Sequence, residues 1–320
     1  GPWAVWPVEA RVPTLLQHVL ASRMAISAGV IFRLLELELE PNDVLAARRS
    51  FASRQPGLRA RALEFLDNTL VGSLRRNVGC VIDDASPNDK LRRAEEWFGI
   101  PQEAPAATVQ RLLDSWRGPD QRSPIVASVA VFTIMTEKMT ELYGAVRDLA
   151  EVADDDLVRE TAVWAVREID GAERGDPMTE MTRIEKMAFL QGVDVFARLS
   201  ADETLQLAMI AREQRVERGE VIYRRDDPPD LMFTVVDGRV RLDGPGGDRR
   251  SVGSAGRFGV LDILSERPRA TTAVAEEDTH LLVIEAEDFF DLLVGNVGIV
   301  KSLFRQVLRG EDAGGVRWRA

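Results

Sequence analysis

The residues from Phe258 to Thr271 have the types and the spacing needed to bind an anion. Gly259 precedes a short helical turn, and the first backbone N–H groups of a helix lack partners within it and attract negative charge. Arg269 follows Pro268, whose fixed backbone stiffens the chain and helps to hold the arginine in place. A guanidinium donates charge-assisted, often bidentate hydrogen bonds to phosphate oxygens. We therefore predict that Gly259 and Arg269 bind a phosphate group.

The same residues also have a purely structural explanation. In it, Gly259 only makes a turn, and Arg269 pairs with Glu266 or Asp262 of its own loop. Both carboxylates also place negative charge beside the predicted phosphate. The two explanations differ in whether the guanidinium is free to meet a ligand.

The composition argues against proteins that bind nucleic acid, that depend on a metal, or that are secreted. The 320 residues carry 41 Lys and Arg against 52 Asp and Glu, a net charge of −11, whereas binding to a phosphate backbone depends on cations. The single cysteine, Cys80, excludes an internal disulfide framework and a multi-cysteine metal site. No phosphate-binding Walker loop, paired-carboxylate motif or metal motif stands out. We predict that the chain is not an enzyme and holds no cofactor or metal.

The elements that must position the loop divide the chain into a helical part and a mostly-β part. From about residue 12 to residue 169, apolar side chains recur every three or four positions, which is typical of amphipathic helices. From about Val216 the period changes to two, and Asp237-Gly238 predicts a tight turn between strands. The predicted strands are residues 221–223, 231–235, 240–242 and 281–283.

These patterns predict a multidomain chain with an all-α part before a β part. The predicted segments are a boundary segment at residues 1–11, a helical domain at 12–170, a linker at 171–183, a β domain with flanking helices at 184–310 and a tail at 311–320. The longest apolar run, residues 125–135, has about half the ~20 residues of a membrane-spanning helix. We expect it to be a buried helix, and we expect no membrane span in this chain.

The helical part contains a weak internal repeat. Residues 58–63 and 158–163 share the pattern apolar-Arg-x-x-Ala-apolar, and each copy follows a short loop. The small alanine lets a neighbouring helix approach, and the arginine can reach an adjacent loop. The pattern resembles HEAT-type repeats, which implies a solenoid of stacked helix pairs. An unrelated helical bundle is the alternative.

The β part resembles the cyclic-nucleotide-binding domain family. The resemblance rests on the ordered motifs Arg218-Gly219-Glu220, Val236-Asp237-Gly238, Phe258-Gly259-Val260-Leu261 and Pro268-Arg269-Ala270-Thr271. It implies an eight-stranded jelly roll that holds cAMP, cGMP or a related phosphate-bearing nucleotide against a short loop with a helix. The ligand-binding residues that it implies are Phe258, Gly259, Val260, Arg269, Ala270 and Thr271.

Val260 departs from the family's pattern. The family has glutamate directly after Phe-Gly, where the carboxylate accepts the ribose hydroxyl, and this chain has valine. Loss of an ionised acceptor forfeits about 1.5–3 kcal/mol. That free energy corresponds to about a tenfold to a hundredfold weaker binding of a cyclic nucleotide.

Two helical segments carry a second resemblance. Residues 31–35 and 62–68 resemble the soluble tail of bacterial nucleotide-transporter-like membrane proteins of the ATP:ADP antiporter type. The resemblance implies a cytoplasmic regulatory module that signals through the helical part to an N-terminal transporter part and is tethered through it to the inner membrane. Gly1-Pro2 looks like the scar of a tag-removing protease, which would make the chain a fragment. The alternative is a protein-interaction scaffold with a degenerate nucleotide pocket.

Overall fold

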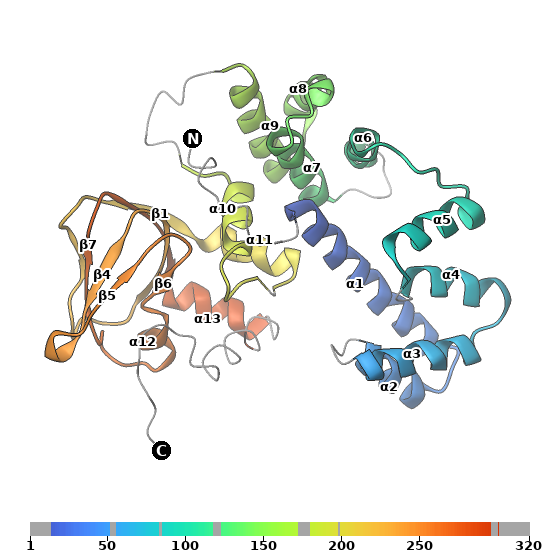
Figure 1. The fold of residues 1–320 in the computed structure, drawn as a ribbon, viewed down its shortest axis with the longest axis horizontal. Helices are drawn as coiled ribbons and strands as arrows, with labels where there is room; N and C mark the ends of the chain where they lie inside the picture. Colours follow the sequence, from blue (N-terminus) through green and yellow to red (C-terminus); the bar gives the residue numbers. More distant parts are fainter. Residues whose placement is uncertain are drawn as a thin grey trace. The chain divides into compact units, whose positions relative to one another are not determined.

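The computed structural model describes residues 14–51, 56–82, 85–117, 123–171, 180–197, 199–295 and 300 (Figure 1). Within these residues helices fill the chain up to Ile169, and the first strand begins only at Arg212. The predicted order, a helical region followed by antiparallel strands with flanking helices, is therefore confirmed. Residues 19–111 form one compact unit, and the described residues on either side of them form the other.

The first unit consists of helices, four of which begin with proline, and the first and last of them extend at one end into the other unit. They are α1 (Leu15–Leu35), α2 (Pro41–Phe51), α3 (Pro56–Thr69), α4 (Gly72–Ile82), α5 (Pro87–Phe98) and α6 (Pro105–Arg117). Proline suits the first helical position because its fixed φ is already helical and its missing N–H needs no partner there. Phe32, Val44, Ala62 and Leu66 lie in the apolar core that joins α1, α2 and α3.

Helix α1 is long and apolar enough, by length and composition alone, to cross a membrane. Only 22% of its most apolar stretch is buried in the protein. Arg23 and Arg33 interrupt the apolar residues of α1, so its sequence contains no uninterrupted apolar run as long as residues 125–135. Core helices of soluble proteins meet the same criterion, so the expected absence of a span in this chain stays a prediction.

The second unit begins its helical part with α7 (Pro124–Thr136), which is buried from Ile125 to Phe132. This burial confirms that the apolar run forms a core helix. The helices that follow are α8 (Tyr143–Val152), α9 (Asp156–Ile169), α10 (Arg183–Gln191) and α11 (Ala201–Ile210). Thr182 and Ser200 each form a capping box that fixes the start of α10 and α11.

The compact units do not divide at the predicted linker of residues 171–183. The guanidinium of Arg183, the first residue of α10, pairs with the carboxylate of Glu160 on α9, and α10 also contacts α7. Helices α7 to α9 therefore pack with the part of the chain that carries the strands. The predicted boundary segment at residues 1–11 and the predicted tail at residues 311–320 lie outside the described residues.

The strands form a roll of two antiparallel sheets. They are β1 (Arg212–Val216), β2 (Val221–Tyr223), β3 (Leu231–Asp237), β4 (Val240–Asp243), β5 (Arg249–Val252), β6 (Arg257–Phe258), β7 (Thr272–Ala275) and β8 (Thr279–Glu285). One sheet has the order β1-β8-β3-β6, and the other has the order β2-β7-β4-β5. The described strands thus confirm the predicted eight-stranded roll, with α12 (Val260–Leu264) and α13 (Ala286–Gly295) beside it.

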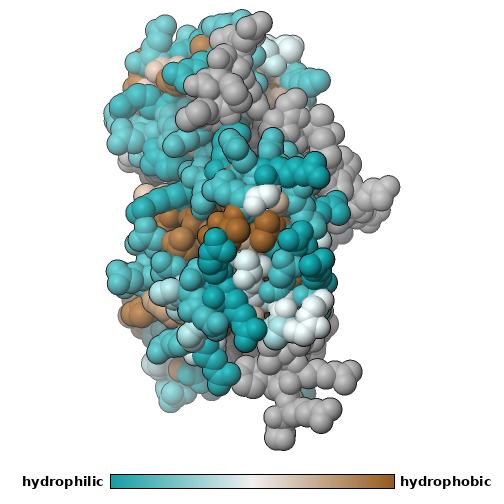
Figure 2. Space-filling model, turned by 90° about the vertical axis from the view of Figure 1, so that its left-hand side faces the viewer, coloured by the Kyte–Doolittle hydropathy of each residue, from teal (hydrophilic) through white to brown (hydrophobic). Residues whose placement is uncertain are grey.

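Alternation of side chains separates the inside of the roll from its surface. Phe233, Val240, Ala273 and Leu281 belong to one buried cluster between the sheets. Seen from the side on which β4, β5 and β7 lie in Figure 1, the surface is mostly hydrophilic, and hydrophobic side chains gather near its middle (Figure 2). A buried apolar face and a mostly polar outer face are usual for antiparallel sheets that pack one face on the core.

The two copies of the sequence repeat make equivalent contacts. Arg59 on α3 donates to the carbonyl oxygens of Phe51 and Ile82, and Arg159 on α9 donates to those of Ala153 and Asp154. Each arginine thus binds a carbonyl at the end of the preceding helix, where helices have unpaired acceptors. Ala62 and Ala162 are fully buried, as expected for helices that approach closely.

Candidate ligand site around Arg269

The loop between β6 and β7 carries the predicted site. Gly259 has φ 82° and precedes α12, which confirms the expected turn. A Cβ atom on this residue would lie 2.6 Å from Nη1 of Arg269 and 3.1 Å from the carbonyl oxygen of Leu231. Only glycine therefore permits both the left-handed backbone and the approach of the guanidinium.

The side chain of Arg269 is 1% exposed and points into the protein. Its Nη1 donates to the carbonyl oxygen of Gly259 at 3.0 Å, and its Nη2 donates to that of Leu231. The guanidinium carbon lies 4.4 Å from the centre of the Tyr223 ring. The buried Nε has no hydrogen-bond partner. A buried cation with an unpaired donor is costly unless an anion compensates it.

Two carboxylates lie near this guanidinium. Asp262 places an oxygen 3.8 Å from Nη1 and is 17% exposed, whereas Asp230 places one 3.7 Å from Nη2 and is 74% exposed. Burial raises the pKa of the Asp262 carboxyl, and the charge of Arg269 partly offsets this effect. The ion pair of the structural explanation, between Asp262 and Arg269, is therefore present. The same guanidinium also keeps an unpaired Nε donor, which suits a phosphate oxygen.

The remaining predicted site residues lie in different environments. Phe258 is buried and stacks on Phe233 with centroids 4.9 Å apart, so it supports the roll from inside. Val260 is 5% exposed at the start of α12. The side chain of Ala270 is exposed. The hydroxyl oxygen of Thr271 lies 3.4 Å from that of Tyr223.

Gly259 and Arg269 thus lie against each other, whereas the side chain of Phe258 packs inside the roll. The sequence analysis missed Tyr223 and the carbonyl of Leu231, which reach the loop from β2 and β3. Burial raises the pKa of the Tyr223 hydroxyl, so the ring faces the guanidinium in its neutral form. No short-range pattern links these residues to Arg269, because their proximity depends on how the strands pair.

The comparison with known families agrees with this geometry. The sequence model of the family described as cyclic nucleotide-binding domain matches residues 213–296. Residues 213–296 form a cyclic-nucleotide-binding domain. It is a regulatory domain by family, and it contains the whole loop from Phe258 to Thr271. The predicted family resemblance of the β part is thereby confirmed.

Several known proteins are similar to the chain over this domain. A protein named as a potassium channel in Rhodopseudomonas palustris is 29% identical over 121 residues, 37% of this chain and 29% of the relative. A cyclic nucleotide-gated potassium channel of Rhizobium etli is 27% identical over 39% of this chain and 35% of the relative. Human patatin-like phospholipase domain-containing protein 6 is 28% identical over 40% of this chain and 9% of the relative. The chain thus matches well under half of the length of these curated relatives.

One solved structure is also similar to part of this chain. The catabolite activator protein of Thermus thermophilus is 29% identical over 36% of this chain and 57% of that chain, with a TM-score of 0.33.

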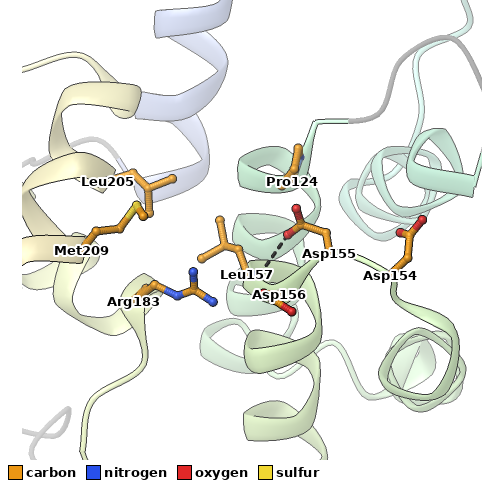
Figure 3. A pocket seen from close by; sticks show the side chains of 8 residues that line it. All are labelled: Pro124, Asp154, Asp155, Asp156, Leu157, Arg183, Leu205 and Met209. Atoms are coloured by element: carbon orange, nitrogen blue, oxygen red, sulfur yellow. Dashed lines mark hydrogen bonds between the residues drawn. The ribbon is translucent and has the colours of Figure 1, made fainter.

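A cavity of about 470 Å³ lies between the α7–α9 helices and α11, away from this loop. Figure 3 shows Asp154, Asp155 and Asp156 on one side of it and Arg183 and Met209 on the other. The side chain of Asp155 accepts hydrogen bonds from two N–H groups at the start of α9, so it caps this helix. In the described part of the chain no group of three or more His, Cys, Asp or Glu side chains is placed to hold a metal ion.

Proposed function

We propose that the cyclic-nucleotide-binding domain of this chain binds a phosphate-bearing nucleotide of the cAMP or cGMP type and acts as a non-catalytic regulatory module. The observation that carries the proposal is the buried guanidinium of Arg269, whose Nε has no partner and which lies against Gly259 in the matched loop. A buried arginine with an unused donor provides a charge-assisted contact for a phosphate. The similarity to a channel named as cyclic nucleotide-gated supports the same ligand class.

We further propose that the helical region is a HEAT-like solenoid through which the domain signals to an N-terminal transporter part at the inner membrane. The equivalent contacts of Arg59 and Arg159 support repeated helix pairs. A mechanical link is provided by Glu213 on β1, which accepts from the N–H of Met181 just before α10. A change in the strands would reach the preceding helices through this contact.

Calorimetric titration with cAMP and cGMP tests the ligand class. Arg269→Lys keeps the charge but removes the fork of donors, and we expect a loss of about 1.5–3 kcal/mol, or about tenfold to a hundredfold in affinity. Arg267→Lys is the matched control, because Arg267 is exposed two residues away, and we expect it to leave the affinity unchanged. Equal affinities in the two variants, or no binding by the unmodified chain at millimolar ligand, would refute the proposal.

A scaffold with a degenerate pocket is the second candidate, and the burial of Val260 favours it. Val260→Glu separates the two functions in a thermal-shift experiment with and without cAMP. In a sensor, the new carboxylate meets the ribose hydroxyl and strengthens binding by about tenfold or more. In a scaffold with a closed pocket, the buried charge lowers the melting temperature and the ligand has no effect.

A further inference from the structure

A groove of about 670 Å³ lies among the successive helices α3, α4 and α5 of the first compact unit. Buried apolar side chains from α3 and α4 line its floor, and they are Leu66, Leu70, Val78 and Ile82. Those on each helix are four residues apart, so each helix contributes a ridge of apolar side chains. A groove between two such ridges has the shape into which a third helix packs.

A glycine keeps this groove open. Gly79 lies in the interior of α4, is half-buried and lines the groove. Glycine is unfavourable inside a helix because it loses more backbone entropy on folding than any other residue. A Cβ atom on Gly79 would meet no atom of the described chain within 4 Å outside its own helix, so internal packing does not require glycine here. The missing side chain instead lets another backbone approach α4 closely.

The rim of the groove carries positive charge, although the whole chain has a net charge of −11. Three arginines line it, and Arg75 is already paired with Asp67, to which its Nε donates at 2.6 Å. Arg76 is exposed and forms no ion pair within the described residues, and Arg93 is half-buried. Glu64 is the remaining carboxylate among the lining residues. The arginines outnumber the carboxylates, so the rim attracts a negatively charged partner.

Trp97 on α5 gives the groove an exposed aromatic side. Its side chain is 40% exposed, and the guanidinium carbon of Arg93 lies 5.6 Å from the centre of its ring. Tryptophan and arginine are enriched among the residues that contribute most of the binding energy at protein interfaces. An apolar floor, an exposed tryptophan and free positive charge thus occur together at one groove.

We propose that this groove binds an amphipathic helix of a partner protein, with an apolar face on the floor and aspartate or glutamate on its flanks. Docking of an amphipathic helix into an apolar groove is a recurrent mode of recognition. The acidic flanks complement Arg76 and Arg93. The inference does not rest on nucleotide binding, because the loop of Arg269 belongs to the other compact unit.

Two labelled synthetic peptides test the proposal by fluorescence anisotropy with the whole chain. Each is about 18 residues long, which makes a helix of about 27 Å, and carries leucine at every third or fourth position. The other positions are mainly glutamate in one peptide and mainly lysine in the second. We expect the glutamate peptide to bind about tenfold or more tightly than the lysine peptide, and to bind more weakly at high salt.

Gly79→Leu tests the place of binding without removing a native contact. The new side chain fills the groove, so we expect the affinity for the glutamate peptide to fall more than about tenfold. The melting temperature should stay the same or rise, because leucine is a much better helix former than glycine. Gly29→Leu is the matched control, since Gly29 lies inside α1, outside the groove, and its Cβ would likewise meet nothing within 4 Å. We expect this control to leave the affinity unchanged.

Arg76→Glu tests the charge of the occupant. It should weaken the glutamate peptide about fivefold and tighten the lysine peptide, whereas Arg61→Glu, at an exposed position of α3 outside the groove, should change either affinity less than about twofold. Equal binding of the two peptides, no binding of either at millimolar concentration, or full affinity in Gly79→Leu would overturn the proposal. Self-association of the unmodified chain that Gly79→Leu abolishes, measured by light scattering, would assign the groove to a second copy and overturn it as well.

Discussion

Replacement of Glu213 by glutamine should strongly destabilise the unit that carries the β-roll. The carboxylate of Glu213 is 6% exposed and lies between β1, β8 and the segment before α10. It accepts the N–H of Met181 at 2.6 Å and the Nε2 of His280 at 2.9 Å, and it lies 3.4 Å from the ammonium of Lys186. A single buried charge therefore connects three parts of the chain.

The size of the effect follows from these contacts. Hydrogen bonds to a charged group contribute about 1.5–3 kcal/mol each, and loss of one member of a buried ion pair costs about 3–5 kcal/mol. Glutamine keeps an acceptor for the N–H of Met181 but leaves the ammonium of Lys186, 12% exposed, without a carboxylate partner and with only the carbonyl oxygen of Ala211 to accept from it. We expect Glu213→Gln to lower the free energy of unfolding by about 3 kcal/mol. That loss corresponds to a decrease in Tm of about 6–12 °C in a unit of this size.

The pH dependence supplies an independent check. Burial alone would raise the pKa of Glu213, but the hydrogen bonds from His280 and Met181 and the charge of Lys186 outweigh it, so this pKa lies below its ordinary value of 4.5. Because the folded pKa is below the unfolded one, the carboxylate stabilises the fold fully above the unfolded pKa. This contribution is lost as the pH falls through the folded pKa. The difference in stability between the unmodified chain and Glu213→Gln should therefore be largest near neutral pH and shrink below about pH 4.5.

Urea unfolding followed by circular dichroism, at pH 7 and at a series of lower pH values, measures both effects. Glu285→Gln is the matched control, because Glu285 pairs with Arg212 across the same two strands at 2.6 Å but at the surface. Exposed pairs contribute about 0–1 kcal/mol. An equal loss of stability in the two variants, or a loss in Glu213→Gln that stays constant down to pH 3, would refute the role of the buried charge.

Two smaller predictions concern the helical region. Asp155→Ala should lower the free energy of unfolding by about 1 kcal/mol because α9 loses its N-cap. The control in thermal unfolding is Asp156→Ala, since the carboxylate of Asp156 is 83% exposed, and equal effects of the two changes would contradict the prediction. Arg59→Met should lower the free energy of unfolding by about 1.5–3 kcal/mol because two carbonyl oxygens lose a charged donor. The control is Arg61→Met, at an exposed position on the same helix, and in urea unfolding its stability should stay within about 0.5 kcal/mol of the unmodified chain. A similar loss in both variants would reject the proposed role of Arg59.

Local patterns in the sequence predicted most of the architecture. The switch from a period of three or four to a period of two marks the change from helices to strands, because side chains repeat differently on the two elements. The predicted strands at residues 221–223 and 240–242 correspond to β2 and β4. Four strands, β1, β5, β6 and β7, were not among the predicted ones. Segments of two to five residues, such as Arg257–Phe258, carry too little periodicity to detect.

Local sequence patterns also predicted the backbone features of the candidate site. Gly259 precedes a short helix, as predicted, and Arg269 follows on the same loop. Both properties are local, because they depend on residue type and on a separation of a few residues. The departure at Val260 was visible for the same reason.

Only the tertiary structure decided which groups surround the guanidinium of Arg269. Tyr223 and Leu231 reach it because β2 pairs with β7 and β3 pairs with β6, and no local pattern encodes which strands become neighbours. The choice between Asp262 and Glu266 as the facing carboxylate depended likewise on the path of the chain after α12. Burial, which gives the charges of Asp262 and Glu213 their effect, arises only when distant segments pack together and exclude water.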